Sequence, residues 1–371
     1  IILMLIMNGE EVNSSEPFNN SSINSFELNG SLPHTTPPAN GMSLENTITF
    51  VVPILFGAIV LVGLVGNSLV VIVVLCNKKM RSTTNILVIN LALADLLFIV
   101  CCVPSTATNY IFKTWVFGDF WCKMYEYLTI VTVYISIYTL VLMSIDRYLA
   151  VVHPVSSRTI RTGDNTCKVI LLLWLSILVV SLPVGISHGE VTQTFGESQS
   201  VRICVLKKDT YRREAFQIVF FVTSFVLPLT VIIYLYVTVV KRLWGVRALG
   251  TRGRDSNKNK RKITVLVITV VSTFAACWFP IQLILLLKSL NSYIITQGTI
   301  ILQIIAQILA YTNSCLNPIL YAFLSENFRR AFWRVLHRSN SESYRLKKLS
   351  TNNEDSSKAL NSKSSKITPC K

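Results

Sequence analysis

Residues 49–77 read TFVVPILFGAIVLVGLVGNSLVVIVVLCN, a run of 29 residues without one Asp, Glu, Lys or Arg. Six further runs follow: 82–112, with only Asp95, and 127–145, 169–187, 215–240, 263–287 and 289–325, with no such residue. A helix needs about 20 apolar residues to cross the hydrocarbon core of a bilayer. Barrel strands would instead show about ten residues of alternating polarity. Because only helices and closed barrels satisfy their backbone hydrogen bonds in lipid, the sequence predicts an all-α membrane protein with a bundle of seven transmembrane helices.

The charges are distributed unevenly along the chain, whose net charge is +16. The first 48 residues hold five acids and no Lys or Arg, whereas residues 241–262 hold nine Lys and Arg against one acid, and the tail after 325 holds eleven against four. Lys and Arg accumulate on the cytoplasmic side of membrane proteins. We therefore expect a multi-pass plasma-membrane protein with an extracellular N-terminus and a cytoplasmic C-terminus, and no nucleic-acid partner.

The segments outside the spans divide the chain into parts. Residues 1–48 are rich in Asn, Ser, Glu, Thr and Pro, which predicts a disordered extracellular tail. Its four sequons predict N-glycosylation at Asn13, Asn19, Asn20 and Asn29. The seven-helix domain is expected over 49–325, a short amphipathic helix on the inner membrane surface over 326–337, and a disordered cytoplasmic tail over 338–371.

The longest outer loop carries two further expectations. Residues 191–194 and 201–206 flank Gly196-Glu197-Ser198, a pattern typical of a β-hairpin. Of the nine cysteines only Cys122 and Cys204 fall at the outer face, where an oxidising compartment favours a disulfide between them. No His/Cys cluster has metal-ligand spacing, and no nucleophile–base pair or phosphate-binding loop is evident. We expect neither an enzyme nor a required cofactor.

Polar residues inside the spans are expensive and mark function by default. Asp95 is the clear case, and polar residues of other spans are candidates to converge on it: Asn67, Ser136, Asn313 and Asn317. Such a cluster could hold a cation such as sodium. It could equally be a hydrogen-bonded packing node.

Seven short motifs follow one another on the predicted spans. They are Gly66-Asn67, Leu91-Ala92-Leu93-Ala94-Asp95, Asp146-Arg147-Tyr148, Trp174, Pro228 with Tyr236, Cys277-Trp278-Phe279-Pro280 and Asn317-Pro318-Ile319-Leu320-Tyr321. Taken singly, the charged triplet could be an ordinary helix-end pair, and the prolines could serve as hinges or only fit static packing. Together, from about residue 50 to 336, they resemble the rhodopsin-like (class A) G protein-coupled receptors.

The resemblance implies roles for the matched positions. An allosteric sodium ion would be held by Asp95, Ser136, Asn313 and Asn317. The switch between inactive and active states would involve Trp278, Pro280, Asp146, Arg147, Tyr148, Tyr236, Asn317, Pro318 and Tyr321. Trp278 would form the floor of the ligand pocket, Arg147 would contact the G protein, and Cys122–Cys204 would be the disulfide that the family shares.

Two observations indicate the ligand class. The chain lacks residues that other groups of these receptors carry, and several of its longer stretches resemble one group. Residues 289–325 contain no Lys for retinal, and Thr129 stands where amine, opioid and somatostatin receptors carry an Asp. Three stretches resemble invertebrate allatostatin A receptors, kin of the galanin receptors: Met80-Arg81-Ser82-Thr83-Thr84-Asn85, Trp115-Val116-Phe117-Gly118-Asp119 and Ser187-His188-Gly189-Glu190-Val191. The implied ligand is an amidated neuropeptide ending in Phe-Gly-Leu-amide; the alternative is a galanin-like or other peptide.

By family position, the amidated end of the peptide would enter between the third, fifth, sixth and seventh spans. The expected lining is Thr129, Ile281, Gln282, Leu285, Gln303 and Gln307, with Trp115 at the rim. Glutamines can both donate hydrogen bonds to a neutral amide and accept them from it. For each glutamine, a hydrogen bond between helices is an equally open role.

The inner side implies the partners. The resemblance implies a heterotrimeric G protein, with the inhibitory type favoured, and arrestin and receptor kinases acting on the Ser-rich tail. Membrane lipid would hold the short inner helix. Lys260 stands where some relatives carry a glutamate that locks Arg147, so we expect appreciable basal signalling.

A seven-helix channel or transporter is the remote alternative; one buried Asp and the lack of an internal repeat speak against it.

Overall fold

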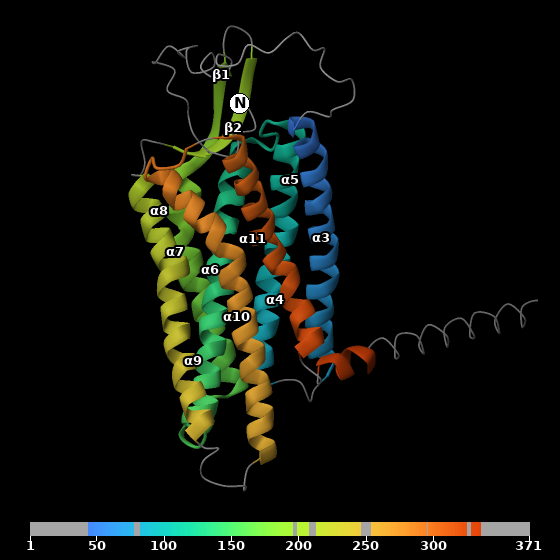
Figure 1. The fold of residues 1–371 in the computed structure, drawn as a ribbon, viewed down its shortest axis with the longest axis vertical. Helices are drawn as coiled ribbons and strands as arrows, with labels where there is room; N and C mark the ends of the chain where they lie inside the picture. The colour runs from blue at the N-terminus through green and yellow to red at the C-terminus, as the bar shows by residue number, and fades with distance from the viewer. Residues whose placement is uncertain are drawn as a thin grey trace, which may run out of the picture.

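The computed structural model describes residues 44–77, 82–195, 199–207, 213–245, 254–294, 296–324 and 328–334. Within these residues, seven helical segments are long and apolar enough to cross a membrane, and they stand together as one bundle (Figure 1). The predicted fold is therefore confirmed. The four sequons and the tail beyond 334 lie outside the described residues.

The described elements follow the order that the charge-free runs predicted. They are α3 (Leu44–Cys76), α4 (Thr83–Cys101), α5 (Val103–Phe112), α6 (Gly118–Val152), a 3-10 turn (Ser156–Arg158), α7 (Gly163–Ser187), β1 (His188–Phe195), β2 (Gln199–Leu206), α8 (Arg213–Phe221), a π-helical turn (Val222–Val226), α9 (Leu227–Gly245), α10 (Arg254–Ser289) and α11 (Gln297–Leu324). Residues 328–334 are helical as well.

Helix α6 is the centre of the bundle and packs against α4, α7 and α9. Its Leu140 and Met143 are buried in one apolar cluster with Val73 of α3, Leu91 of α4 and Val267 of α10. The opposite faces of the outer helices are apolar too: Val180 of α7 is 75% exposed and Ile233 of α9 is 61% exposed. An apolar exterior around a packed core is what lipid as the surrounding solvent requires.

Two spans depart from the regular helices that we expected. The second span is broken at Cys102, and Pro104 stands in the first turn of α5. Proline has no N–H to give to the residue four positions earlier and clashes with its carbonyl, so α4 ends and α5 starts in a new direction. The fifth span contains the π-helical turn Val222–Val226, directly before Pro228. Such turns widen a helix locally and occur often near functional sites.

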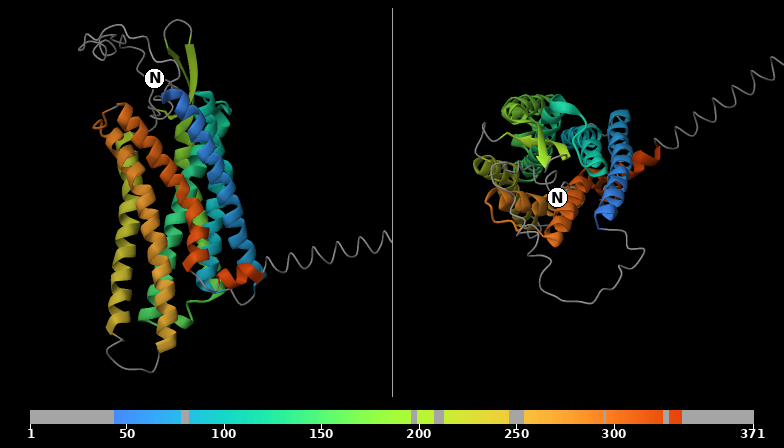
Figure 2. Two further views of the ribbon diagram at one scale, coloured as in Figure 1. Left: turned by 45° about the vertical axis from the view of Figure 1, so that its right-hand side comes forward. Right: turned by 90° about the horizontal axis from the view of Figure 1, so that it is seen from above.

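The β-hairpin predicted in the long outer loop is present. Strands β1 and β2 pair antiparallel, with Glu190 opposite Cys204 and Val191 opposite Ile203. The hairpin stands over one end of the bundle, and the view along the helices shows it above the ring that they form (Figure 2). At the other end, the short helix 328–334 lies across the base, with Phe328 and Ala331 buried and Trp333 exposed (Figure 1).

Candidate ligand-binding site

A cavity of about 320 Å³ lies under the hairpin, at the end of the bundle that carries the disulfide. Helices α5, α6, α7, α8, α10 and α11 and both strands contribute to its wall. This size is at the lower end of the range of roughly 300–1,000 Å³ that is usual for ligand pockets. The wall combines apolar and aromatic side chains with polar groups, most of them neutral.

Six of the seven residues expected in the ligand pocket line this cavity. They are Thr129, Ile281, Gln282, Leu285, Gln303 and Gln307. Helical spacing explains the sixth-span residues, because 278, 281, 282 and 285 recur at intervals of three and four and so share one face. Trp278, which lies one turn before Ile281, also lines the cavity.

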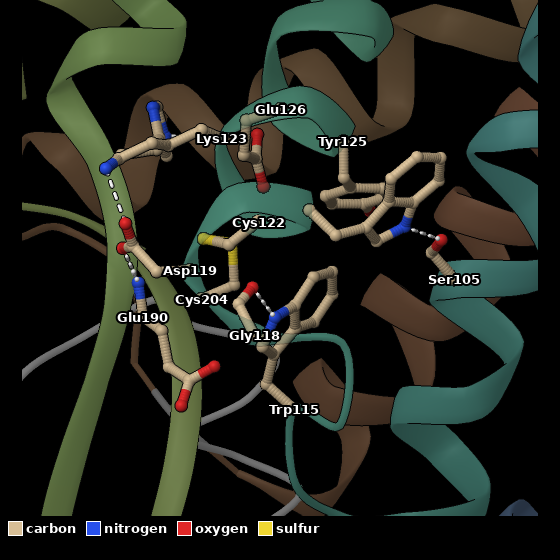
Figure 3. The surroundings of a disulfide bond; sticks show 12 residues. Ser105, Trp115, Gly118, Asp119, Cys122, Lys123, Tyr125, Glu126, Glu190 and Cys204 are labelled. Atoms are coloured by element: carbon tan, nitrogen blue, oxygen red, sulfur yellow. Dashed lines mark hydrogen bonds and ion pairs between the residues drawn. A yellow bond between two sulfur atoms is a disulfide. The ribbon is translucent and has the colours of Figure 1, made fainter.

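Trp115 is the exception, and its expected place at the rim is wrong. The residue is 1% exposed and does not line the cavity. Its backbone N–H donates to the Arg202 carbonyl at 2.7 Å, its Nε1 donates to the Gly118 carbonyl at 2.8 Å, and its ring packs on Tyr125 (Figure 3). Trp115 therefore fastens the first outer loop beneath the hairpin; a large aromatic ring is buried by preference when its one N–H finds an acceptor.

The three glutamines all form hydrogen bonds between helices. Tyr110 donates to Gln307 Oε1 at 2.7 Å. Lys288 donates to Gln303 Oε1 at 2.6 Å. Gln282 Nε2 donates to Ser224 Oγ of the π-helical turn at 3.1 Å. The structural role that the sequence left open is thus present, and it coexists with a position on the cavity wall.

Unpartnered polar atoms gather on this wall. Among the described residues, four cavity-lining side chains have a buried nitrogen or oxygen without a hydrogen-bond partner: Asn109 Oδ1, Gln217 Nε2, Trp278 Nε1 and Gln282 Oε1. Buried polar groups are nearly always hydrogen-bonded, and each exception in a native structure calls for an explanation. Two acceptors and two donors of residues in the wall of one cavity are therefore without a protein partner among the described residues.

Sequence reasoning missed Glu126 and His188, which also line the cavity. Glu126 lies on α6 one turn after Cys122, beside the disulfide (Figure 3). Its carboxylate and His188 Nε2 are 3.9 Å apart. The missed signal was helical spacing: Glu126 precedes Thr129 by three residues and so shares its face. Glu126 lies one residue before the charge-free run 127–145, outside the stretch whose polar residues were considered as candidates.

The disulfide predicted between Cys122 and Cys204 is confirmed. It joins the outer end of α6 to β2, and Asp119 adds a second link by accepting from the Glu190 backbone N–H of β1 at 2.9 Å (Figure 3). Both strands are thus fixed to α6. The wall of the cavity that the hairpin supplies is held in place by these two links.

A second polar cluster lies deeper in the bundle, around Asp95. Asn317 Nδ2 donates to Asp95 Oδ2 at 2.9 Å, and both residues are buried. Ser136 and Asn313 are buried too, and Asn313 Oδ1 has no partner among the described residues. The described part of the chain has no group of three or more His, Cys, Asp or Glu suited to a metal ion. One carboxylate among neutral oxygens nevertheless fits a singly charged hard cation, which prefers oxygen ligands.

The charged triplet lies at the end of α6 remote from the disulfide. Asp146 accepts from Thr84 Oγ1 at 2.7 Å and from Arg161 Nε at 2.8 Å. Arg147 donates to Asp146 and to Thr84. Arg147 is therefore held on α6 and α4, whereas Tyr148 packs against His153, outside this network.

The remaining residues of the expected activation switch lie on helices α9, α10 and α11. Trp278 stacks on Phe274 with ring centroids 6.0 Å apart, and Pro280 follows it two residues later inside α10. Pro318 packs against α3 at Gly66, where an added Cβ would lie 3.0 Å from the Pro318 Cβ. Tyr236 and Tyr321 are buried, and the Tyr321 hydroxyl has no partner among the described residues. A glycine at position 66 is what permits α11 to approach α3 so closely.

Comparison with known proteins agrees with this arrangement. Residues 66–321 match the family model of the 7 transmembrane receptor (rhodopsin family). The chain is 50% identical over 308 residues to the allatostatin-A receptor of Bombyx mori, covering 83% of this chain and 85% of the relative. It is 39% identical over 324 residues to a galanin-like G protein-coupled receptor of Caenorhabditis elegans (80% and 75% covered). Human galanin receptor type 2 is 37% identical over 284 residues (76% and 72% covered).

Proposed function

The chain belongs to the rhodopsin family of seven-transmembrane receptors, and on this premise we propose that its ligand is an amidated peptide of the allatostatin A type, ending in Phe-Gly-Leu-amide. The family is one of signal receptors in the plasma membrane, not of enzymes. One relative is named an allatostatin-A receptor, and another is named a galanin-like G-protein coupled receptor. A peptide-activated G protein-coupled receptor is therefore the function of this chain.

The observation that carries the choice of ligand is the set of unpartnered atoms on the cavity wall. A carboxamide presents two N–H donors and one carbonyl acceptor. The wall offers the acceptors Asn109 Oδ1 and Gln282 Oε1 and the donor Gln217 Nε2, with Trp278 Nε1 at the floor. No Lys or Arg is among the lining residues, which disfavours a ligand that ends in a carboxylate. A galanin-like ligand is the second candidate, supported by the galanin receptors among the relatives.

The remaining partners follow from the same premise. We place the N-terminal tail outside and the C-terminal tail inside the cell, with an inhibitory G protein at the inner face. The Ser-rich tail would be phosphorylated by receptor kinases and then bound by arrestin, because phosphate adds charge and strong acceptors. A sodium ion at Asp95 would act as an allosteric ligand.

A second-messenger assay in cultured cells tests the proposal. Cells that express the receptor are given an amidated Phe-Gly-Leu peptide, the free-acid form or galanin, and cyclic AMP and calcium are measured. We expect a response to the amide at concentrations at least about a hundredfold lower than to galanin, a difference of roughly 2.7 kcal/mol in binding. Equal or greater potency of galanin would replace the allatostatin assignment with the galanin-like one.

A further inference from the structure

Among the described residues that line the cavity, Glu126 is the one acid, and none is Lys or Arg. It comes from α6, in the same wall as Tyr125 and Thr129. Its side chain is 27% exposed, so the carboxylate is largely removed from water and yet reaches the space that a ligand would fill. A charge in such a position interacts strongly with whatever charge or dipole a ligand brings.

The carboxylate has unused acceptor capacity. Within the described residues it accepts no hydrogen bond, and its nearest charged partner is His188 Nε2 at 3.9 Å. His188 Nδ1 lies 2.7 Å from the Val184 carbonyl. A carbonyl oxygen can only accept, so His188 Nδ1 is the donor in this contact, and the 3.9 Å between Nε2 and the Glu126 carboxylate is too long for a hydrogen bond.

We infer that Glu126 is the specificity residue that distinguishes an amidated ligand from its free-acid form. This inference rests on the proposed function, in which the carboxyl-terminal end of the peptide enters the cavity. An ionised carboxylate is an acceptor only, and the terminal –CONH2 of an amidated peptide supplies the matching N–H donors. A terminal –COO⁻ has no donor and brings a like charge into a site of low dielectric, which opposes binding.

The neutral acceptors alone do not account for such discrimination. Asn109 and Gln282 present amide oxygens to the cavity, but an amide side chain can also turn its N–H2 group toward a ligand carboxylate. Glu126 cannot do so. The charge of Glu126, added to these acceptors, converts a preference for the amide into rejection of the acid.

The test combines one substitution with three forms of one peptide: the amide, the methyl ester and the free acid. Glu126→Gln keeps the size of the side chain and an acceptor oxygen but removes the charge. We expect the wild-type receptor to rank amide above ester above acid in competition binding on intact cells. In E126Q the acid should gain at least about tenfold in affinity while the amide changes by less than about threefold.

Glu214→Gln is the matched control, because it makes the same change of charge on an exposed acid in the first turn of α8 that does not line the cavity. It should leave the ratio of amide to acid affinity as in the wild type. An amide peptide with an acetylated N-terminus controls for a ligand ammonium as the partner of Glu126. The acetylated peptide should bind wild-type receptor as tightly as the unmodified one.

Several results would overturn the inference. They are an unchanged amide-to-acid ratio in E126Q, equal affinity of ester and acid for the wild type, or loss of binding on acetylation. Equal affinity of ester and acid for the wild type would overturn the inference even if E126Q fails to reach the cell surface. Failure of the proposed function is a separate outcome, since the wild-type receptor would then bind none of the three forms with appreciable affinity.

Discussion

The two polar atoms of the Gln282 side-chain amide have different surroundings. Its Nε2 donates to Ser224 Oγ, while its Oε1 is buried on the cavity wall without a partner. The first contact joins α10 to the π-helical turn of the fifth span. If the second atom accepts from the ligand, as we propose, Gln282 links the ligand to a hydrogen bond between two helices.

We predict that Gln282→Ala lowers the potency of the amidated peptide about tenfold, which corresponds to roughly one hydrogen bond. Ser224→Ala is the matched control, since it removes the partner on the fifth span and keeps the Gln282 carbonyl. It should change potency by less than about threefold, within the range of a weak neutral contact. Dose–response curves corrected for surface expression provide the measurement. Equal losses in the two variants would show that the helix contact, not the ligand contact, matters.

Asp95 and Asn317 place a carboxylate and an amide together in the bundle core. If sodium occupies this cluster in the inactive state, agonist affinity in wild-type membranes should rise when sodium is replaced by a bulky organic cation. Asp95→Asn should abolish this rise, because the neutral amide no longer attracts the ion. Asp119→Asn, which alters an acid at the outer end of α6, should retain it. A sodium effect that persists in D95N would argue against this cluster as the site.

At the scale of the elements, the spans could be predicted because charge depletion over about 20 residues is a strong physical requirement of the bilayer. The interruptions inside the spans could not. The sequence motifs did not single out Pro104, and whether a proline kinks a helix or ends it depends on neighbours that the sequence does not show. The π-helical turn Val222–Val226 cannot be recognised from the sequence, because it adds only one residue to a helix within an uninterrupted apolar run.

The contacts of Arg147 bear on basal signalling. The arginine is held by Asp146 and Thr84, on α6 and α4. Residue 260 on α10 is Lys, which cannot form a salt bridge with it. We therefore expect measurable signalling without ligand, and we expect Lys260→Glu to reduce it by adding the missing partner.

Lys258→Glu is the control for this prediction. It makes the same change of charge on α10, but residues two positions apart lie on different faces of a helix. Basal cyclic AMP or G protein activation, normalised to surface expression, is the readout. The prediction would be wrong if wild-type cells matched mock-transfected cells, or if the two variants lowered the basal signal equally.

On the scale of the whole molecule, the two ends of the bundle differ: one carries the disulfide, and the other is rich in Lys and Arg. The Cys122–Cys204 disulfide and the hairpin lie at the first. The segment 241–262, with nine Lys and Arg, follows the opposite end of α9. The sequence predicted this polarity from charge alone, whereas the cavity depended on side chains from six helices meeting in space. Glu126 shows the difference: its spacing from Thr129 was visible, but its place on the cavity wall required the packed bundle.

This polarity predicts the orientation in the membrane. An epitope tag at the N-terminus should be accessible to antibody on intact cells, and one at the C-terminus only after permeabilisation. Treatment with a glycosidase should lower the apparent mass, and Asn→Gln changes at Asn13, Asn19, Asn20 and Asn29 together should remove that difference. A C-terminal tag that is accessible on intact cells would reverse the assigned orientation.

The central claim is that the cavity beneath the hairpin binds an amidated peptide. Its most direct test is saturation binding of a labelled Phe-Gly-Leu-amide peptide to membranes that contain the receptor, with Thr129→Trp as the variant that fills the cavity. We predict saturable binding to the wild type that the unlabelled amide displaces, and a loss of at least about tenfold in affinity for T129W at equal surface expression. Binding that T129W leaves unchanged, or that only galanin displaces, would contradict the account.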